Sequence, residues 1–175
     1  MQTYPDRALS IPAITVDDSA CDVDDLAVCG GVEVTVPAGE EWDVLVARAV
    51  ADDWVGIEAL SGISGTVADA VRRNASRFGA SVADVVTSVR TWDRTQDAQR
   101  TFAAVDCGFG EGISRFVEAA DGGERYEILD VVFLFRQGDL TRPIADADLA
   151  AALGVEPGDR VPLRVVRDAL TGGEA

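Results

Sequence analysis

The feature that most constrains the fold is a long run of strand-forming residues, RYEILDVVFLFRQ, at positions 125 to 137. β-Branched and aromatic side chains favour extended backbone, and this run is the strongest strand signal in the chain. Positions 32 to 36, VEVTV, alternate as a half-buried strand does, and positions 82 to 93 are also rich in strand formers. Positions 54 to 60, WVGIEAL, indicate a short buried strand or turn. These segments predict a sheet.

Helical patterns lie between and after the predicted strands. Thr66 is a predicted N-cap for a helix over positions 67 to 76. Two further helices are predicted over positions 146 to 154 and 162 to 170. After the turn PAGE, apolar residues recur at helical spacing and predict a core helix: Trp42, Leu45, Val46, Ala49 and Val50. The predicted fold class is therefore α+β, with a mostly antiparallel sheet and helices packed against it.

The length of 175 residues corresponds to one domain large enough for a substantial core. No apolar run approaches the roughly 18 residues that a membrane span needs. The first ten residues, MQTYPDRALS, lack the apolar segment of a secretory signal. We therefore expect a cytoplasmic protein without a membrane partner.

The charge balance excludes several kinds of partner and site. The formal net charge is -16, from 31 acidic and 15 basic residues, and every basic residue is arginine. A field of this sign repels phosphate backbones, so we expect no nucleic acid partner. The chain has no histidine, which removes the commonest general base and metal ligand. Acid–base chemistry is left to Asp, Glu, Tyr, Cys or water.

The sequence also gives no metal-binding pattern. The three cysteines, Cys21, Cys29 and Cys107, lack a CxxC spacing and a histidine partner, so we expect buried free thiols and no zinc site. The acidic residues near the N-terminus do not follow an EF-hand spacing, and a solvated edge is the simpler interpretation: Asp17, Asp18, Asp22, Asp24 and Asp25.

Several motifs together resemble one enzyme family. The stretches that carry the resemblance are AGEEWDVLVARAVADDWVGIEALSGISGTV, NASRFG, SVRTWDR, CGFGEGISRF and LAAALGVEPGDRVPLRVVRDAL. In order and spacing they are similar to the flavin-dependent UDP-N-acetylenolpyruvoylglucosamine reductases (MurB). The resemblance implies the middle, second FAD-binding domain of these enzymes. It divides the chain into an irregular acidic segment at 1–31, the MurB-like domain at 32–170 and a tail at 171–175.

The departures from the family pattern suggest that the reductase apparatus is lost. Nothing before position 32 resembles the family's first FAD-binding lobe, and nothing after 170 its substrate lobe. Glu111 and Gly112 stand where the family has a tyrosine and a catalytic arginine, which reverses the charge available to a developing anion. Ala68 and Asp69 replace two glycines of the loop that cradles the diphosphate. We therefore expect no cofactor, with tight FAD binding and reductase turnover absent.

The favoured hypothesis is a cofactor-independent enzyme that performs a cyclisation, isomerisation or elimination on an apolar substrate in secondary metabolism. The candidate catalytic residues are Glu111, Ser114 and Arg115. If Phe109, Ile113 and Phe116 wall the site, desolvation raises the pKa of Glu111 and suits it to proton transfer. The candidate ligand cleft, once covered by the flavin, comprises Gly62, Ile63, Ser64, Gly65, Asn74, Arg77, Phe78 and Phe109.

Plainer interpretations stay open for each of these residues. Glu111 can be an exposed loop glutamate, Arg77 and Arg115 solvated partners of nearby acids, and Asn74 a brace for its helix. Two other functions also stay open. One is a non-catalytic binding or assembly module whose former domain interfaces are covered by a homodimer or a partner chain. The other is a FAD- and NADPH-dependent reductase fragment that needs partner lobes.

Overall fold

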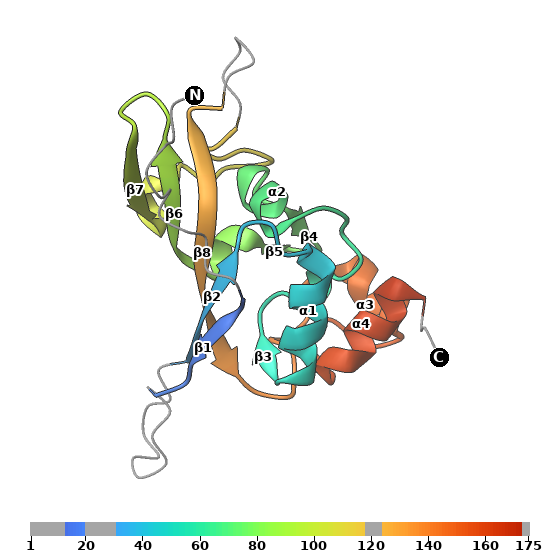
Figure 1. Ribbon diagram of the computed structural model, residues 1–175. Coiled ribbons are helices and arrows are strands. Elements are labelled where there is room, and N and C mark those ends of the chain that lie inside the picture. The colour runs from blue at the N-terminus through green and yellow to red at the C-terminus, as the bar shows by residue number, and fades with distance from the viewer. Residues whose placement is uncertain (1–12, 20–30, 118–123, 173–175) are drawn as a thin grey trace.

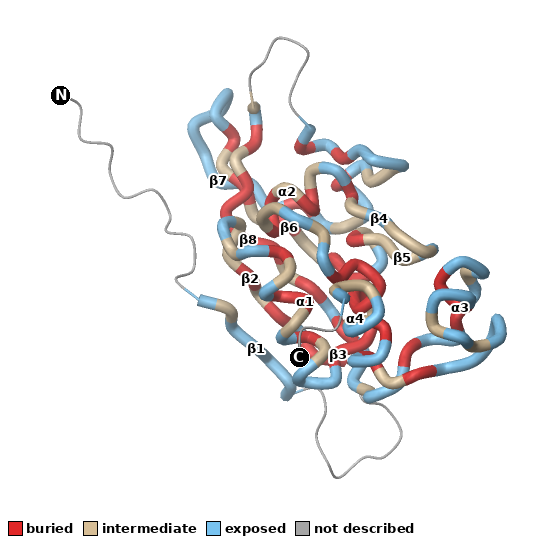
Figure 2. The backbone as a smooth tube through the Cα atoms, turned by 90° about the vertical axis from the view of Figure 1, so that its right-hand side faces the viewer, coloured by how far each residue is buried: buried red, intermediate tan, exposed pale blue. Residues whose placement is uncertain are grey.

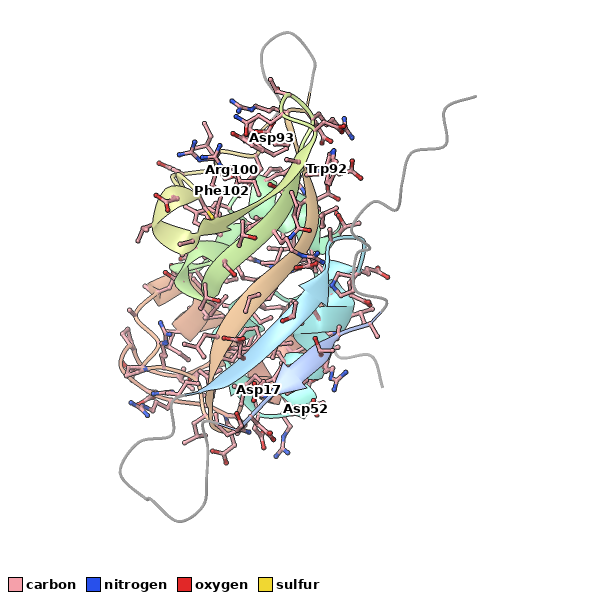
Figure 3. The ribbon with its side chains drawn as sticks, turned by 60° about the vertical axis from the view of Figure 1, so that its left-hand side comes forward. Asp17, Asp52, Trp92, Asp93, Arg100 and Phe102 are labelled. Atoms are coloured by element: carbon pink, nitrogen blue, oxygen red, sulfur yellow. The ribbon has the colours of Figure 1, made fainter. Side chains whose placement is uncertain are left out.

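The computed structural model describes residues 13–19, 31–117 and 124–172. Its main sheet runs in the order β1-β2-β8-β6-β7, and β3 pairs with β8 beside this path. All of these pairings are antiparallel. The helices lie on one side of the sheet in Figure 1, and Figure 3 looks onto the opposite side. The predicted α+β class is confirmed.

The strands of this sheet are β1 (Thr15–Asp17), β2 (Val32–Pro37), β3 (Trp54–Val55), β6 (Val86–Asp93), β7 (Ala98–Ala103) and β8 (Tyr126–Gln137). The predicted strand at 125 to 137 is β8, which pairs with β2 on one side and β6 on the other. Val34 lies opposite Phe133 and Val36 opposite Val131, and all four are buried. The apolar run is therefore the centre of the sheet.

Helix α1 (Trp42–Ala51) packs on this buried face as its apolar stripe predicts. Its buried residues are Trp42, Leu45, Val46 and Ala49. The Trp42 indole lies 6.3 Å from the Phe133 ring and donates a hydrogen bond to the Leu60 carbonyl oxygen at 3.2 Å. Leu60 ends the 3-10 turn η1 (Glu58–Leu60). Figure 2 shows buried residues concentrated along the strands and α1.

The C-terminal helices α3 (Ala147–Leu153) and α4 (Leu163–Thr171) form a second, smaller packing unit. Its buried apolar residues are Ala59, Ile144, Leu149, Ala150, Val161 and Val166. The Asp146 side chain caps α3 by accepting a hydrogen bond from the Leu149 N–H at 2.9 Å, and Gly154 ends the helix at φ 68°. Only a left-handed residue at this point satisfies the last carbonyls, which explains the glycine.

Three sequence-based predictions need correction. Helix α2 (Val67–Arg72) ends well before position 76, because Asn74 has φ 41° and the chain turns there into the hairpin β4 (Ser76–Arg77) and β5 (Ala80–Ser81). The predicted strand at 82 to 93 begins with a 3-10 turn, η2 (Val82–Asp84), before β6. Strand β7, followed by the 3-10 turn η3 (Ala104–Asp106), was not predicted.

The expectation of irregular structure up to position 31 is wrong at β1. Thr15 pairs with Thr35 and Asp17 with Glu33, so this segment adds an edge strand to β2. Cys21, Cys29 and the acidic residues Asp22, Asp24 and Asp25 lie outside the described residues. In the described part of the chain, no helix is long and apolar enough to cross a membrane, and no cluster of potential metal ligands occurs.

Candidate functional site

The Gly-rich turn before α2 is held by a reciprocal cap between Thr66 and Asp69. The Asp69 N–H donates to the Thr66 hydroxyl at 3.2 Å, and the Thr66 N–H donates to the Asp69 carboxylate at 2.9 Å. The Thr66 hydroxyl also donates to this carboxylate at 2.9 Å. This is the capping-box arrangement, and it confirms Thr66 as the N-cap.

The carboxylate of Asp69 stays ionised at the start of α2. The hydrogen bond from the Thr66 N–H lowers the pKa of Asp69 below its usual 3.8, with smaller contributions from the Thr66 hydroxyl and the charges of Arg72 and Arg73. Arg72 Nη1 lies 3.5 Å from Asp69 Oδ1. A negative charge therefore already occupies the start of α2, where an anion would otherwise be favoured.

Several backbone N–H groups of this turn have partners within the chain, which leaves fewer donors for a diphosphate. Besides the two N–H groups of the cap, the Gly62 N–H donates to the Asp43 carboxylate at 2.7 Å. The Val67 and Ala68 N–H groups donate to the carbonyl oxygens of Glu40 and Ala38, in the turn between β2 and α1, at 2.8 and 3.0 Å. A phosphate cradle needs such donors unpaired and aimed at the ligand. The start of α2 therefore has a carboxylate and paired amides, while the N–H groups of Ile63, Ser64 and Gly65 make no hydrogen bond among the described residues.

Asp43 connects this turn to the C-terminal helix. Its two carboxylate oxygens accept hydrogen bonds from the two terminal nitrogens of Arg167, each at 2.8 Å. The bond from Arg167 is the main cause of a lowered pKa at Asp43, and the Gly62 N–H contributes in the same direction. The pair links the first turn of α1 to α4 and fixes how α4 lies on α1.

Asn74 is a structural brace. Its side-chain nitrogen donates to the Gly110 carbonyl oxygen at 2.9 Å, and its side-chain oxygen accepts from the Ala83 N–H at 2.9 Å. Both polar atoms are used, and the residue is buried. This supports the interpretation of Asn74 as a brace between the loop at 107–116 and the turn η2.

The three candidate catalytic residues are not gathered in a cleft. The Ser114 hydroxyl donates to the Arg72 carbonyl oxygen at 2.8 Å, and the Arg115 guanidinium donates to the Asp106 carbonyl oxygen at 2.6 Å. Glu111 is exposed, and so is half of Ile113, at 51%. The burial that would make Glu111 a proton-transfer group is not present.

The remaining candidate cleft residues are divided between different surroundings. Gly62 and Ser64 are exposed, while Ile63, Gly65 and Phe109 are half-buried. Arg77 donates to the Ser61 carbonyl oxygen at 3.2 Å, and its guanidinium carbon lies 4.8 Å from the centre of the Phe78 ring.

A separate cavity of about 350 Å³ lies beside the hairpin β4–β5, against the C-terminal helices. We call it the C-terminal cavity. Its lining is Gly56, Glu58, Ala59, Phe78, Gly79, Ala80, Asp84, Thr141, Arg142, Pro143, Ile144, Ala145, Asp146, Leu149 and Val166. Phe78 is the only predicted cleft residue in this lining.

The segment 141–146 supplies six lining residues that were not predicted. Its backbone is tied to the turn at 158–161: Thr141 and Ile144 each donate an N–H there, at 2.9 Å. The Val161 N–H also donates to the buried Thr141 hydroxyl at 3.2 Å. The sequence between β8 and α3 has no periodic pattern or motif that marks a binding site. The position of segment 141–146 follows only from the packing of α3 and α4 under the hairpin β4–β5.

Comparisons with known proteins give one consistent result, although no family model matches the chain. A UDP-N-acetylenolpyruvoylglucosamine reductase of Cutibacterium acnes is 44% identical over 144 residues, which are 82% of this chain and 38% of that protein. The reductase of Thermobifida fusca is 43% identical over 154 residues, 88% of this chain and 41% of that protein.

The solved structure of UDP-N-acetylenolpyruvylglucosamine reductase (MurB) from Thermus caldophilus matches 59% of this chain and 36% of its own, at 28% identity and a TM-score of 0.50. The chain thus spans about two fifths of the length of these relatives. The resemblance noted from the motifs is confirmed: the chain belongs to the MurB family as a partial member.

Proposed function

We propose that this MurB-like chain acts without flavin, as a module that binds a small, largely apolar molecule in the C-terminal cavity. The observation that carries the proposal is the shape and lining of this cavity. Its volume of about 350 Å³ lies at the lower end of known small-molecule sites. Its apolar lining comes from Ala59, Phe78, Ala80, Ile144, Leu149 and Val166.

The absence of flavin in this proposal rests on the turn before α2. Asp69 and the paired N–H groups of Gly62, Thr66, Val67 and Ala68 leave only the N–H groups of Ile63, Ser64 and Gly65 as donors for a diphosphate. An added phosphate would also meet the negative charge of Asp69.

The cofactor-free cyclase hypothesis has less support. None of Glu111, Ser114 and Arg115 lines the cavity, and Ser114 and Arg115 are engaged with backbone carbonyls. Unlike proton-transfer catalysis, binding does not need a side chain with a shifted pKa. Binding is therefore the simpler function for this lining. A homodimer or partner chain that covers the former domain interfaces stays a prediction.

The second candidate is a reductase fragment that works with partner lobes. The identity of 44% to an enzyme named UDP-N-acetylenolpyruvoylglucosamine reductase favours it. In that case FAD and the named substrate would bind only together with the parts of such an enzyme that this sequence does not cover. Glu111 and Gly112, where the family has tyrosine and arginine, oppose it because they leave no cation for the developing negative charge.

Calorimetric titration separates these functions. We expect heat of binding with phenylbutanol, a neutral apolar probe, and none with FAD. Ala145, at the mouth of the cavity, is exposed, so Ala145→Trp places an indole there without disturbing the core. This variant should lose phenylbutanol binding, while Ala103→Trp on the exposed edge of β7 should keep it. Tight FAD binding by the wild-type chain would instead support the reductase fragment.

A further inference from the structure

The C-terminal cavity contains three carboxylates in addition to its apolar residues, and these charges restrict the ligand class. Glu58 comes from η1, Asp84 from η2 and Asp146 from the N-cap of α3. The single basic residue in the lining is Arg142. The charge of the lining is therefore negative, from three acidic groups against one basic group.

Backbone hydrogen bonds hold the three carboxylates in place. The Gly56 N–H donates to Glu58 Oε2 at 2.7 Å, and the Ser81 N–H donates to Asp84 Oδ2 at 2.8 Å. Asp146 Oδ1 accepts from the Leu149 N–H at 2.9 Å. In each bond one oxygen of the carboxylate meets an amide dipole, which orients the group but brings no opposite full charge.

No cation within the described residues forms an ion pair with these carboxylates. The arginines that form ion pairs within the described residues pair with other acidic residues: Asp43, Asp52, Asp69, Asp93, Glu124, Glu127 and Asp130. Arg142 is exposed and makes no ion pair among the described residues either. The whole chain, these groups included, has a formal net charge of -16, which strengthens a negative potential in a concave, partly apolar site.

The apolar part of the lining selects the body of the ligand. Ala59, Ile144 and Leu149 are buried beside the cavity, and the half-buried Phe78 ring adds an aromatic surface. Arg77 lies over that ring and outside the lining, bound to the Ser61 carbonyl oxygen. A compact hydrocarbon or aromatic group would bury its surface against these side chains.

We propose that the C-terminal cavity binds an amine: a monocation whose apolar body packs on Phe78, Ile144 and Leu149 while its ammonium group faces Glu58, Asp84 and Asp146. This inference rests on the proposed function and adds the ligand class. Charge complementarity favours this occupant over an anion, which three carboxylates repel, and over a neutral molecule, which gains nothing from them.

Three probes with one apolar body test the proposal. Phenylbutylamine is a cation near neutral pH, because alkyl ammonium groups have pKa values of about 10. Phenylbutanol is neutral and phenylbutyrate is an anion. In calorimetric titrations at physiological salt, we expect the amine to bind about fivefold more tightly than the alcohol, and the acid more weakly than both.

Removal of two carboxylate charges tests whether these residues cause the preference for the amine. The double variant Asp84→Asn, Asp146→Asn keeps an acceptor oxygen for each backbone N–H and removes two charges. It should bring the amine and the alcohol to about equal affinity. The control is Asp17→Asn on β1, where Asp17 Oδ1 similarly accepts the Ser19 N–H at 3.0 Å. β1 lies away from α3 in Figures 1 and 2, and Figure 3 labels Asp17 there, so this change should leave the amine preference intact.

The possible outcomes distinguish the two proposals. Tighter binding of the acid or the alcohol than of the amine overturns the ligand class and leaves cavity binding standing. An amine preference that the double variant leaves undiminished also overturns it, since Asp84 and Asp146 then contribute nothing to that preference. Absence of binding by all three probes means that the proposed binding function itself has failed.

Discussion

The Asp69 carboxylate accepts two hydrogen bonds from Thr66, one from its backbone N–H and one from its hydroxyl, each at 2.9 Å. A side chain of the chain itself thereby takes the place that an anion would occupy at the start of α2. The same contact both stabilises the helix start and opposes a diphosphate. The contact between Thr66 and Asp69 therefore connects the stability of this turn with the loss of flavin binding that we propose.

Asp69→Ala removes the reciprocal cap and should lower the free energy of unfolding by about 1 kcal/mol. Asp69→Asn keeps an acceptor oxygen and should cost less. Urea denaturation of both variants measures the difference. Asp148→Ala is the control, because Asp148 is exposed in the first turn of α3 and its carboxylate is not the cap. Equal losses from Asp69→Ala and Asp148→Ala would show that the cap has no special role.

Arg167→Leu should destabilise the attachment of α4 by about 1 to 2 kcal/mol, since it removes a bidentate, partly buried pair with Asp43. Arg164→Leu on the same helix is the matched control, because Arg164 is exposed. Denaturation midpoints of the two variants give the comparison. A loss of the same size in both would mean that the pair with Asp43 is unimportant.

The Asp43–Arg167 pair also predicts a pH dependence. The folded-state pKa of Asp43 is lowered below its usual 3.8, mainly by Arg167. A lowered pKa means that the stabilisation is full above the unfolded value and is lost as the pH falls through the folded value. The stability gap between wild type and Asp43→Asn should therefore be largest near neutral pH and shrink as the pH falls below the usual pKa of 3.8. A stability gap between wild type and Asp43→Asn that is the same at neutral and acidic pH would contradict this prediction.

Asn74→Ala should cost about 2 kcal/mol, because it removes two hydrogen bonds and places alanine at φ 41°. Asn74→Asp keeps the acceptor for the Ala83 N–H but places a buried carboxylate oxygen against the Gly110 carbonyl oxygen, so its cost should be at least as large as that of alanine. Thermal unfolding without any ligand is the measurement. Full stability of Asn74→Ala would refute the brace and return Asn74 to the candidate binding residues.

Cys107 should resist alkylation in the folded protein. Its thiol is fully buried, and burial raises its pKa from 9.0 to about 11, so the reactive thiolate is about 100-fold scarcer at neutral pH. Mass spectrometry of the Cys107 peptide after iodoacetamide treatment, folded and in denaturant, measures this. Equal labelling rates in the two states would contradict it.

Most of the main sheet and the helices could be predicted, because their signals are local. The run at 125 to 137 and the stripe of α1 carry their periodicity within one segment. Strand β7 was missed because four of its first five positions are polar or alanine and only Phe102 is buried. Its position comes from pairing with β6, which no local pattern encodes.

The candidate site was predictable only in part. The family motifs pointed to the turn at Gly62–Gly65 and the hairpin at Phe78, and the structure places Phe78 in the C-terminal cavity. The opposite wall, from Thr141 to Asp146, lies more than sixty positions further along the sequence and has no motif. That wall exists because α3 and α4 pack beside η1, a tertiary contact that sequence spacing does not reveal.

The most direct test of the account is an amide-resolved NMR titration of the wild-type chain with phenylbutylamine. We predict saturable shifts of the backbone amides around the C-terminal cavity, at Ala80, Asp84, Ile144 and Leu149, with no comparable change in the turn Gly62–Asp69. Shifts confined to the turn Gly62–Asp69, or no saturable shift at all, would contradict the claim that this cavity is the functional site.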